Sequence, residues 1–137
     1  LVKKTVDDWL NEVDYHRLNT GNYQPTPFAL KFMNFIKLVN GNEGESSLTP
    51  VVHLMMLDKI VSPIDMVANL CARGMAKTTL MFEYFVLYLA VFGELDGFGK
   101  VDGMIYVSDS MENGVKSARK NIEHRYYSSE FLQRWVP

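Results

Sequence analysis

The chain has 137 residues, of which 47% are hydrophobic and 22% charged, and its formal net charge at pH 7 is −2. This composition excludes a disordered chain, and the charge excludes the overall basic character of many nucleic-acid-binding proteins, although a local basic patch stays open. The length suits a single hydrophobic core. One cysteine, Cys71, rules out an internal disulfide and fits a reducing compartment.

Three helices are predicted in the first half of the chain. Residues 3–18 place apolar side chains three and four positions apart, which indicates an amphipathic helix. A second helix is expected over 27–39, with Pro27 in its first turn, and a third from Pro50 to about Ile60.

Alternating strands and helices are predicted in the second half. A strand is predicted over residues 65–70, because the segment is nearly continuously apolar from Met66 onward, as in a strand covered on both faces in a parallel sheet. Residues 77–92 predict a buried helix in which the one charge after Lys77 is Glu83, which marks the exposed edge, and this apolar run is too short to span a membrane. A second core strand is expected over 103–107, followed by a helix over 111–126.

The turn between the first strand and its helix contains a candidate phosphate-binding loop. In the pattern G-x-x-x-x-G-K-[ST], Lys77 and Thr78 match, whereas Cys71 and Ala76 stand at the glycine positions and Gly74 lies between them. The alternative interpretation is a strand-to-helix turn whose cations only face solvent.

In a phosphate-binding loop, each of these residues would have a defined role. The helix N-terminus and loop backbone face the phosphates, Lys77 neutralises the transferring phosphoryl group, and Thr78 ligates Mg²⁺. Gly74 lets the backbone approach closely, and Arg73 adds a second cation as a sensor or arginine finger. The predicted ATP-binding residues are Arg73, Gly74, Met75, Ala76, Lys77, Thr78 and Thr79, and the catalytic candidates among them are Lys77 and Arg73.

Gln24 is the remaining candidate ligand of the nucleotide. Many P-loop ATPases place a glutamine upstream of the loop, where its amide reads adenine, and Tyr23 or Phe28 would stack on the base. The alternative is that Gln24 is a polar turn residue and the aromatic rings belong to the core.

The acidic residues that would complete the Mg²⁺ site are not found in this sequence. Asp109 follows an apolar strand, but Asp109 and Glu112 have the spacing of a helix capping box, and no second acidic residue follows Asp109 directly. We therefore expect an incomplete P-loop ATPase, the N-terminal piece of a longer protein. The predicted fold is α/β, a partial three-layer P-loop domain with a parallel sheet over 63–137, preceded by a helical segment over 1–62.

The loop sequence Ala72-Arg73-Gly74-Met75-Ala76-Lys77-Thr78-Thr79 resembles the deviant Walker A motif of the large terminase subunits of tailed bacteriophages. The resemblance extends over about residues 64–126. It implies an ATPase that drives double-stranded DNA into the capsid, with ATP and Mg²⁺ as cofactors and a possible nuclease domain beyond this chain. The implied partners are DNA, the portal protein, the small terminase subunit and further copies in a ring. The implied location is the cytoplasm of the infected bacterium.

Two other functions fit the same residues. A helicase or a nucleotide kinase would share Lys77 and Thr78. A non-enzymatic helical interaction domain would carry the Lys-Thr turn by accident and contact a partner through Trp9, Trp135 and residues 40–47. For DNA, the local candidate is the basic side of helix 111–126, formed by Lys116, Arg119, Lys120 and Arg125. Glu112 and Glu123 dilute its charge, and the favoured alternative is a face that is simply solvated.

Overall fold

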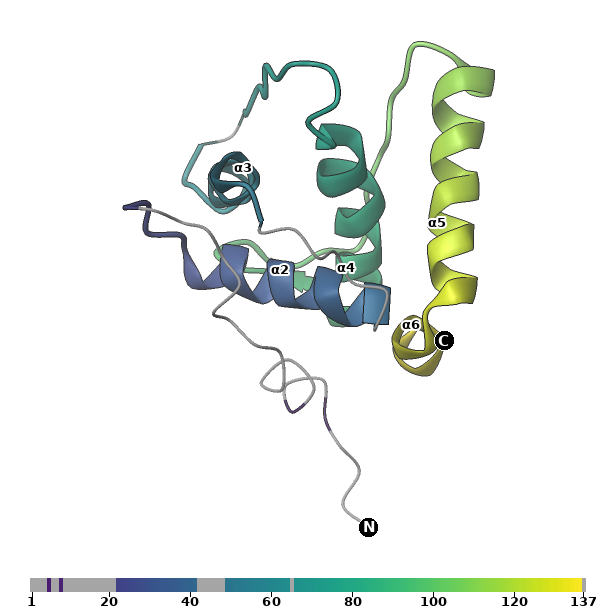
Figure 1. The fold of residues 1–137 in the computed structure, drawn as a ribbon, viewed down its shortest axis with the longest axis horizontal. Helices are drawn as coiled ribbons and strands as arrows, with labels where there is room; N and C mark the ends of the chain where they lie inside the picture. The colour runs from purple at the N-terminus through teal and green to yellow at the C-terminus, as the bar shows by residue number, and fades with distance from the viewer. Residues whose placement is uncertain (1–4, 6–7, 9–21, 42–48, 65, 137) are drawn as a thin grey trace.

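The computed structural model describes residues 5, 8, 22–41, 49–64 and 66–136, and these ranges are mostly helical (Figure 1). The predicted helix over 3–18 falls almost wholly outside the described residues. The helices and strands are α2 (Pro27–Asn40), α3 (Val51–Ile60), the π-helix η3 (Thr79–Tyr84), α4 (Phe85–Phe92), β1 (Glu94–Leu95), β2 (Gly99–Lys100), the π-helix η4 (Met111–Lys116), α5 (Ser117–Ser128) and α6 (Glu130–Trp135).

Helix α2 forms where its sequence predicts it. The Thr26 hydroxyl accepts a hydrogen bond from the backbone N–H of Ala29 at 3.2 Å, and Pro27 occupies the first turn. Gly41 follows the last residue with a φ of +58°, a conformation that glycine adopts readily. The predicted helix over 27–39 is confirmed.

The core lies where α2 meets η3, α4, α3 and α6, and Figure 1 shows α2 crossing close to α4. Aromatic rings dominate it: Phe32 of α2 stacks on Tyr88 of α4 with ring centroids 5.0 Å apart, and Phe35 meets Phe131 of α6 at 6.1 Å. Such contacts add to the stabilisation from burying the rings. The predicted burial of helix 77–92 is confirmed, since η3 continues directly into α4 and both contribute core residues.

The predicted three-layer α/β fold with a parallel sheet is wrong. Within the described residues the one sheet is the antiparallel pair of β1 and β2, in which Glu94 lies opposite Lys100 and Leu95 opposite Gly99. The segments expected as core strands, 65–70 and 103–107, form no strand where the structure describes them.

The predicted strands do not form because neither segment has a neighbouring segment to which its backbone can hydrogen-bond within the described part of the chain. No residue in 66–70 or 102–107 forms a hydrogen bond between backbone groups within the described part of the chain. Apolar sequence favours a strand, but a strand persists only when a neighbour satisfies its N–H and C=O groups. The side chains expected in the core are instead exposed, Leu70 at 97% and Ile105 at 89%.

The prediction that Glu83 marks an exposed edge is also wrong. Its side chain is buried because α5 packs against η3 and supplies hydrogen-bond donors. The Asn121 amide donates to Glu83 at 2.8 Å, and the Arg125 guanidinium donates to it twice at 3.2 Å. Glu83 therefore joins the helix after the candidate loop to α5.

The predicted starts of two helices also need correction. Ser110, rather than Asp109, caps η4, because its hydroxyl accepts from the N–H of Asn113 at 3.1 Å. The helix predicted from Pro50 begins one residue later, at Val51, with Pro50 in the capping position and no side chain capping the helix.

Candidate phosphate-binding loop

Two residues of loop 71–76 adopt positive φ angles: Gly74 at +88° and Ala76 at +50°. Ala76 is the one non-glycine residue with a positive φ in the described part of the chain. It stands where the strict phosphate-loop pattern has its second glycine. The alanine thus adopts a left-handed conformation that glycine adopts at no steric cost.

The helix that follows the loop begins at Lys77. The backbone N–H of Leu80 donates to the carbonyl of Ala76 at 2.9 Å, which is the first hydrogen bond of the helix. The N–H groups of Ala76, Lys77 and Thr78 donate to no backbone acceptor within the described residues. Free donors at a helix start carry partial positive charge and attract anions.

The Lys77 side chain turns back over the loop. Its ammonium donates to the carbonyl oxygen of Cys71 at 3.5 Å, and the residue is half-buried. The Cys71 thiol in turn lies 3.9 Å from the sulfur of Met56 on α3. The cation is therefore held beside the loop backbone.

A groove of about 290 Å³ opens beside the first residues of this helix. Lys77 and Thr78 lie at its edge, and the ring of Tyr106 stacks on Phe82 with centroids 3.8 Å apart and planes 20° apart. Segment 103–107 thus contributes Met104 and Tyr106 to the lining of the groove. The lining residues are Asn69, Lys77, Thr78, Met81, Phe82, Met104 and Tyr106.

His53 is a contact of the loop that sequence reasoning missed. Its Nε2 atom lies 3.0 Å from the carbonyl oxygen of Met75, the residue between Gly74 and Ala76. The two residues are 22 positions apart, and no spacing pattern in the sequence indicates the contact.

The other predicted ligands are not gathered at the loop. Arg73 is exposed, and its side chain forms no hydrogen bond or ion pair within the described residues. Gln24 is exposed and likewise forms no side-chain hydrogen bond in the part of the chain that the structure describes. Phe28 is a core residue, 2% exposed, and the Tyr23 hydroxyl donates to Asp58 of α3.

The residues present fit a magnesium ion carried by phosphates rather than one held by the protein alone. No group of three His, Cys, Asp or Glu side chains able to hold a metal occurs among the described residues. Thr78 is exposed beside Lys77 and offers one hydroxyl oxygen. Mg²⁺ commonly takes few protein ligands and completes its shell with phosphate oxygens and water.

The predicted basic surface on the helix over 111–126 is largely paired with carboxylates. The Lys116 ammonium contacts Glu112, Arg119 contacts Glu123 at 2.7 Å, and Arg125 points to buried Glu83. Lys120 is the remaining cation of the four predicted for this surface.

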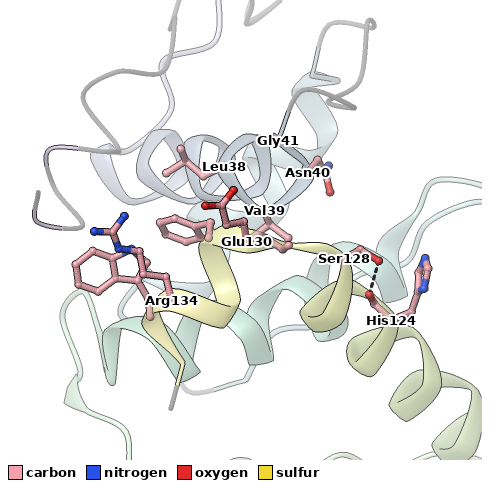
Figure 2. Close-up of a pocket in the computed structure, with 11 residues that line it drawn as sticks. Leu38, Val39, Asn40, Gly41, His124, Ser128, Glu130 and Arg134 are labelled. Atoms are coloured by element: carbon pink, nitrogen blue, oxygen red, sulfur yellow. Dashed lines mark hydrogen bonds between the residues drawn. The ribbon is translucent and has the colours of Figure 1, made fainter.

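A larger hollow of about 590 Å³ lies between the C-terminal ends of α2 and α5 and helix α6 (Figure 2). His124 and Ser128 lie at one end, where the Ser128 hydroxyl donates to the His124 carbonyl at 2.7 Å, and Arg134 lies at the other. No residue predicted for the nucleotide site lines this hollow.

Comparisons of the chain with models of protein families, with curated proteins and with solved structures found no match.

Proposed function

We propose that loop 71–76 and the first turn of the following helix bind the phosphates of a nucleoside triphosphate. The observation that carries this proposal is the pair of positive φ angles at Gly74 and Ala76, directly before a helix that begins at Lys77. Such a backbone presents successive N–H groups to an anion, and an adjacent lysine adds a full positive charge.

Each residue of the loop then has a chemical role. Lys77 leaves the Cys71 carbonyl and pairs with the outer phosphates, which neutralises charge on the transferring phosphoryl group. Thr78 would hold Mg²⁺, which would draw charge from the phosphates. Arg73 is exposed and free to reach the γ-phosphate, and the groove beside Thr78 gives the ligand room.

The loop sequence supports a more specific proposal. Its resemblance to the large terminase subunits of tailed bacteriophages favours ATP as the nucleotide. In the full protein, hydrolysis would drive double-stranded DNA into a capsid in the infected cell, with the portal protein and the small subunit as partners. No helix within the described residues has the length and apolar character to cross a bilayer. Because the sequence contains no apolar strand followed by Asp-Glu, we expect this chain alone to bind weakly and hydrolyse slowly.

Calorimetric titration of Mg·ATP into the chain tests the phosphate loop. We expect saturable binding that Lys77→Ala abolishes and that Lys120→Ala, an exposed lysine on α5, leaves unchanged. Equal binding by all three proteins, or no binding by the wild type, would contradict the proposal. Stimulation of hydrolysis by double-stranded DNA without strand separation distinguishes a packaging motor from a helicase.

A further inference from the structure

The His53 side chain is the one side chain outside the loop that hydrogen-bonds to residues 72–76 within the described part of the structure. It projects from α3, whose Leu54 and Leu57 are fully buried against the core. The same helix is joined to the start of α2, because Asp58 accepts hydrogen bonds from the N–H of Thr26 at 3.0 Å and from its hydroxyl at 2.6 Å. His53 thus connects the loop to a fixed element.

The partner of His53 determines which atom of the ring carries hydrogen. A backbone carbonyl can only accept, so the contact with Met75 at 3.0 Å requires a hydrogen on Nε2 of His53. Both the neutral ring protonated at Nε2 and the imidazolium satisfy this requirement.

Because the peptide bond is planar, the contact with the Met75 carbonyl also fixes the direction of the next N–H group, that of Ala76. In a trans peptide the C=O of one residue and the N–H of the next point in opposite directions, and the described chain contains no cis peptide. With the Met75 carbonyl directed at His53 on α3, the N–H of Ala76 points away from α3. That N–H donates to no backbone group in the described residues, so it is available to an anion.

We propose that His53 is a positioning residue of the phosphate loop: it holds the Met75 carbonyl and thereby directs the Ala76 N–H at a bound phosphate. This inference rests on the proposed function of the loop. It adds a residue that the phosphate-loop pattern does not contain, because the pattern is local and His53 lies on another helix. The loop departs from that pattern at Ala76, next to the carbonyl that His53 holds.

The test compares two substitutions of His53 in the full chain. His53→Leu removes the donor and keeps an apolar side chain of moderate size, whereas His53→Gln keeps an N–H donor near the position of Nε2. Because one hydrogen bond contributes modestly, we expect His53→Leu to weaken Mg·ATP binding by about threefold to tenfold. We expect His53→Gln to bind within about twofold of the wild type, because its amide replaces the lost donor. His124→Leu, the same change on α5, serves as the control and should bind as the wild type does.

The outcomes separate this inference from the proposed function. If Lys77→Ala abolishes binding while His53→Leu binds as the wild type does, the role of His53 is refuted and the phosphate loop stands. If His53→Gln loses as much affinity as His53→Leu, ring shape rather than donation matters, and the inference also fails. If the wild type does not bind Mg·ATP, the proposed function fails first.

A measurement on the unmodified chain does not depend on how the variants fold. Nitrogen-15 NMR of the histidine rings reports which nitrogen of neutral His53 carries the proton. We expect the proton on Nε2. We also expect the amide signal of Ala76 to shift when inorganic triphosphate with Mg²⁺ is added. A proton on Nδ1 with a bare Nε2 would overturn the inference.

Discussion

Ala76 makes the candidate loop unusual at the scale of single residues. A β-carbon at a φ of +50° strains the backbone, and the loop tolerates it one residue before the catalytic candidate Lys77. Strain of this kind persists where neighbouring contacts hold the backbone, and here His53 holds the adjacent carbonyl. Because Gly74 and Ala76 both have a positive φ, replacing glycine by alanine at one position and alanine by glycine at the other measures this strain.

Gly74→Ala and Ala76→Gly should change stability in opposite directions. Nothing lies within 4 Å of a β-carbon built at Gly74, so Gly74→Ala suffers only from its φ of +88°, at about 1 kcal/mol. Ala76→Gly removes a comparable strain and adds some unfolded-chain entropy, for a net gain of roughly 0.5 kcal/mol. Urea unfolding of the two variants checks this, and equal shifts of the same sign would contradict the backbone geometry.

The Tyr23 hydroxyl makes stability depend on pH in the alkaline range. Its hydrogen bond to Asp58, together with burial and the nearby carboxylate charge, raises the pKa of Tyr23 from 10.0 to about 12. The unfolded chain therefore releases this proton at lower pH than the folded chain does. The stabilisation is fully present below pH 10 and is lost as the pH rises towards 12.

Tyr23→Phe isolates this effect because phenylalanine has no proton to release. Between pH 10 and pH 12, the free energy of unfolding of the wild type should fall more steeply than that of Tyr23→Phe. Urea titrations at several pH values measure the two slopes. Asp58→Asn, which removes the carboxylate, should flatten the wild-type slope in the same way, and identical slopes for all three proteins would refute the assignment.

At the residue scale, the structure could be predicted from the sequence where the signal is local. The position of Lys77 and Thr78 at a helix start follows from adjacent residues, and Pro27 marks the beginning of α2. His53 could not be assigned to the loop because its partner is 22 residues away. Glu83 was misplaced for the same reason, since its partner Arg125 lies 42 residues further along the chain.

At the scale of elements, the contact between η3 and α5 depends on one buried ion pair. The Glu83 side chain is 5% exposed and that of Arg125 is 26% exposed. Removing Arg125 and removing Glu83 should therefore lower the stability of the fold by different amounts. The Arg125 guanidinium also donates at 2.6 Å to the Tyr84 hydroxyl, which donates to Asn40 of α2 at 2.7 Å. The cluster therefore joins three helices.

Arg125→Leu should destabilise the chain more than Glu83→Leu does. It leaves a buried carboxylate whose one remaining donor among the described residues is Asn121, at a cost of about 3 kcal/mol, whereas the guanidinium left by Glu83→Leu keeps more contact with water. The double variant should lose less than the sum of the two. Denaturant unfolding measures all three, and Arg119→Leu, which breaks an exposed pair with Glu123, is the matched control with little expected change.

Helices and strands differ in how far the sequence determines them. The helices over 27–39 and 77–92 contain their own hydrogen bonds, so periodicity and capping residues suffice to predict them. The apolar runs at 65–70 and 103–107 predict strands, but their hydrogen bonds must come from another segment. No described segment provides them, and the parallel sheet therefore does not form.

At the scale of the whole molecule, the helical core and segments 66–70 and 103–107 have opposite character. The core buries aromatic rings from α2, α4 and α6, whereas segments 66–70 and 103–107 present large apolar side chains to water. Contiguous exposed apolar surface favours association with other surfaces. The structure therefore predicts that association and folding stability respond to different substitutions.

Substituting Leu70 and Ile105 together by serine should reduce association without weakening the fold. These side chains are 97% and 89% exposed. Replacing them therefore removes almost no buried apolar area. We expect lower fluorescence of a hydrophobic dye, less self-association in sedimentation experiments and an unchanged urea midpoint. Leu57→Ser, at a position with 0% exposure, is the opposite control and should lose about 3 kcal/mol or more of stability. If the double variant instead lowers the midpoint, segments 66–70 and 103–107 are packed against protein in solution, and the exposed apolar surface does not exist.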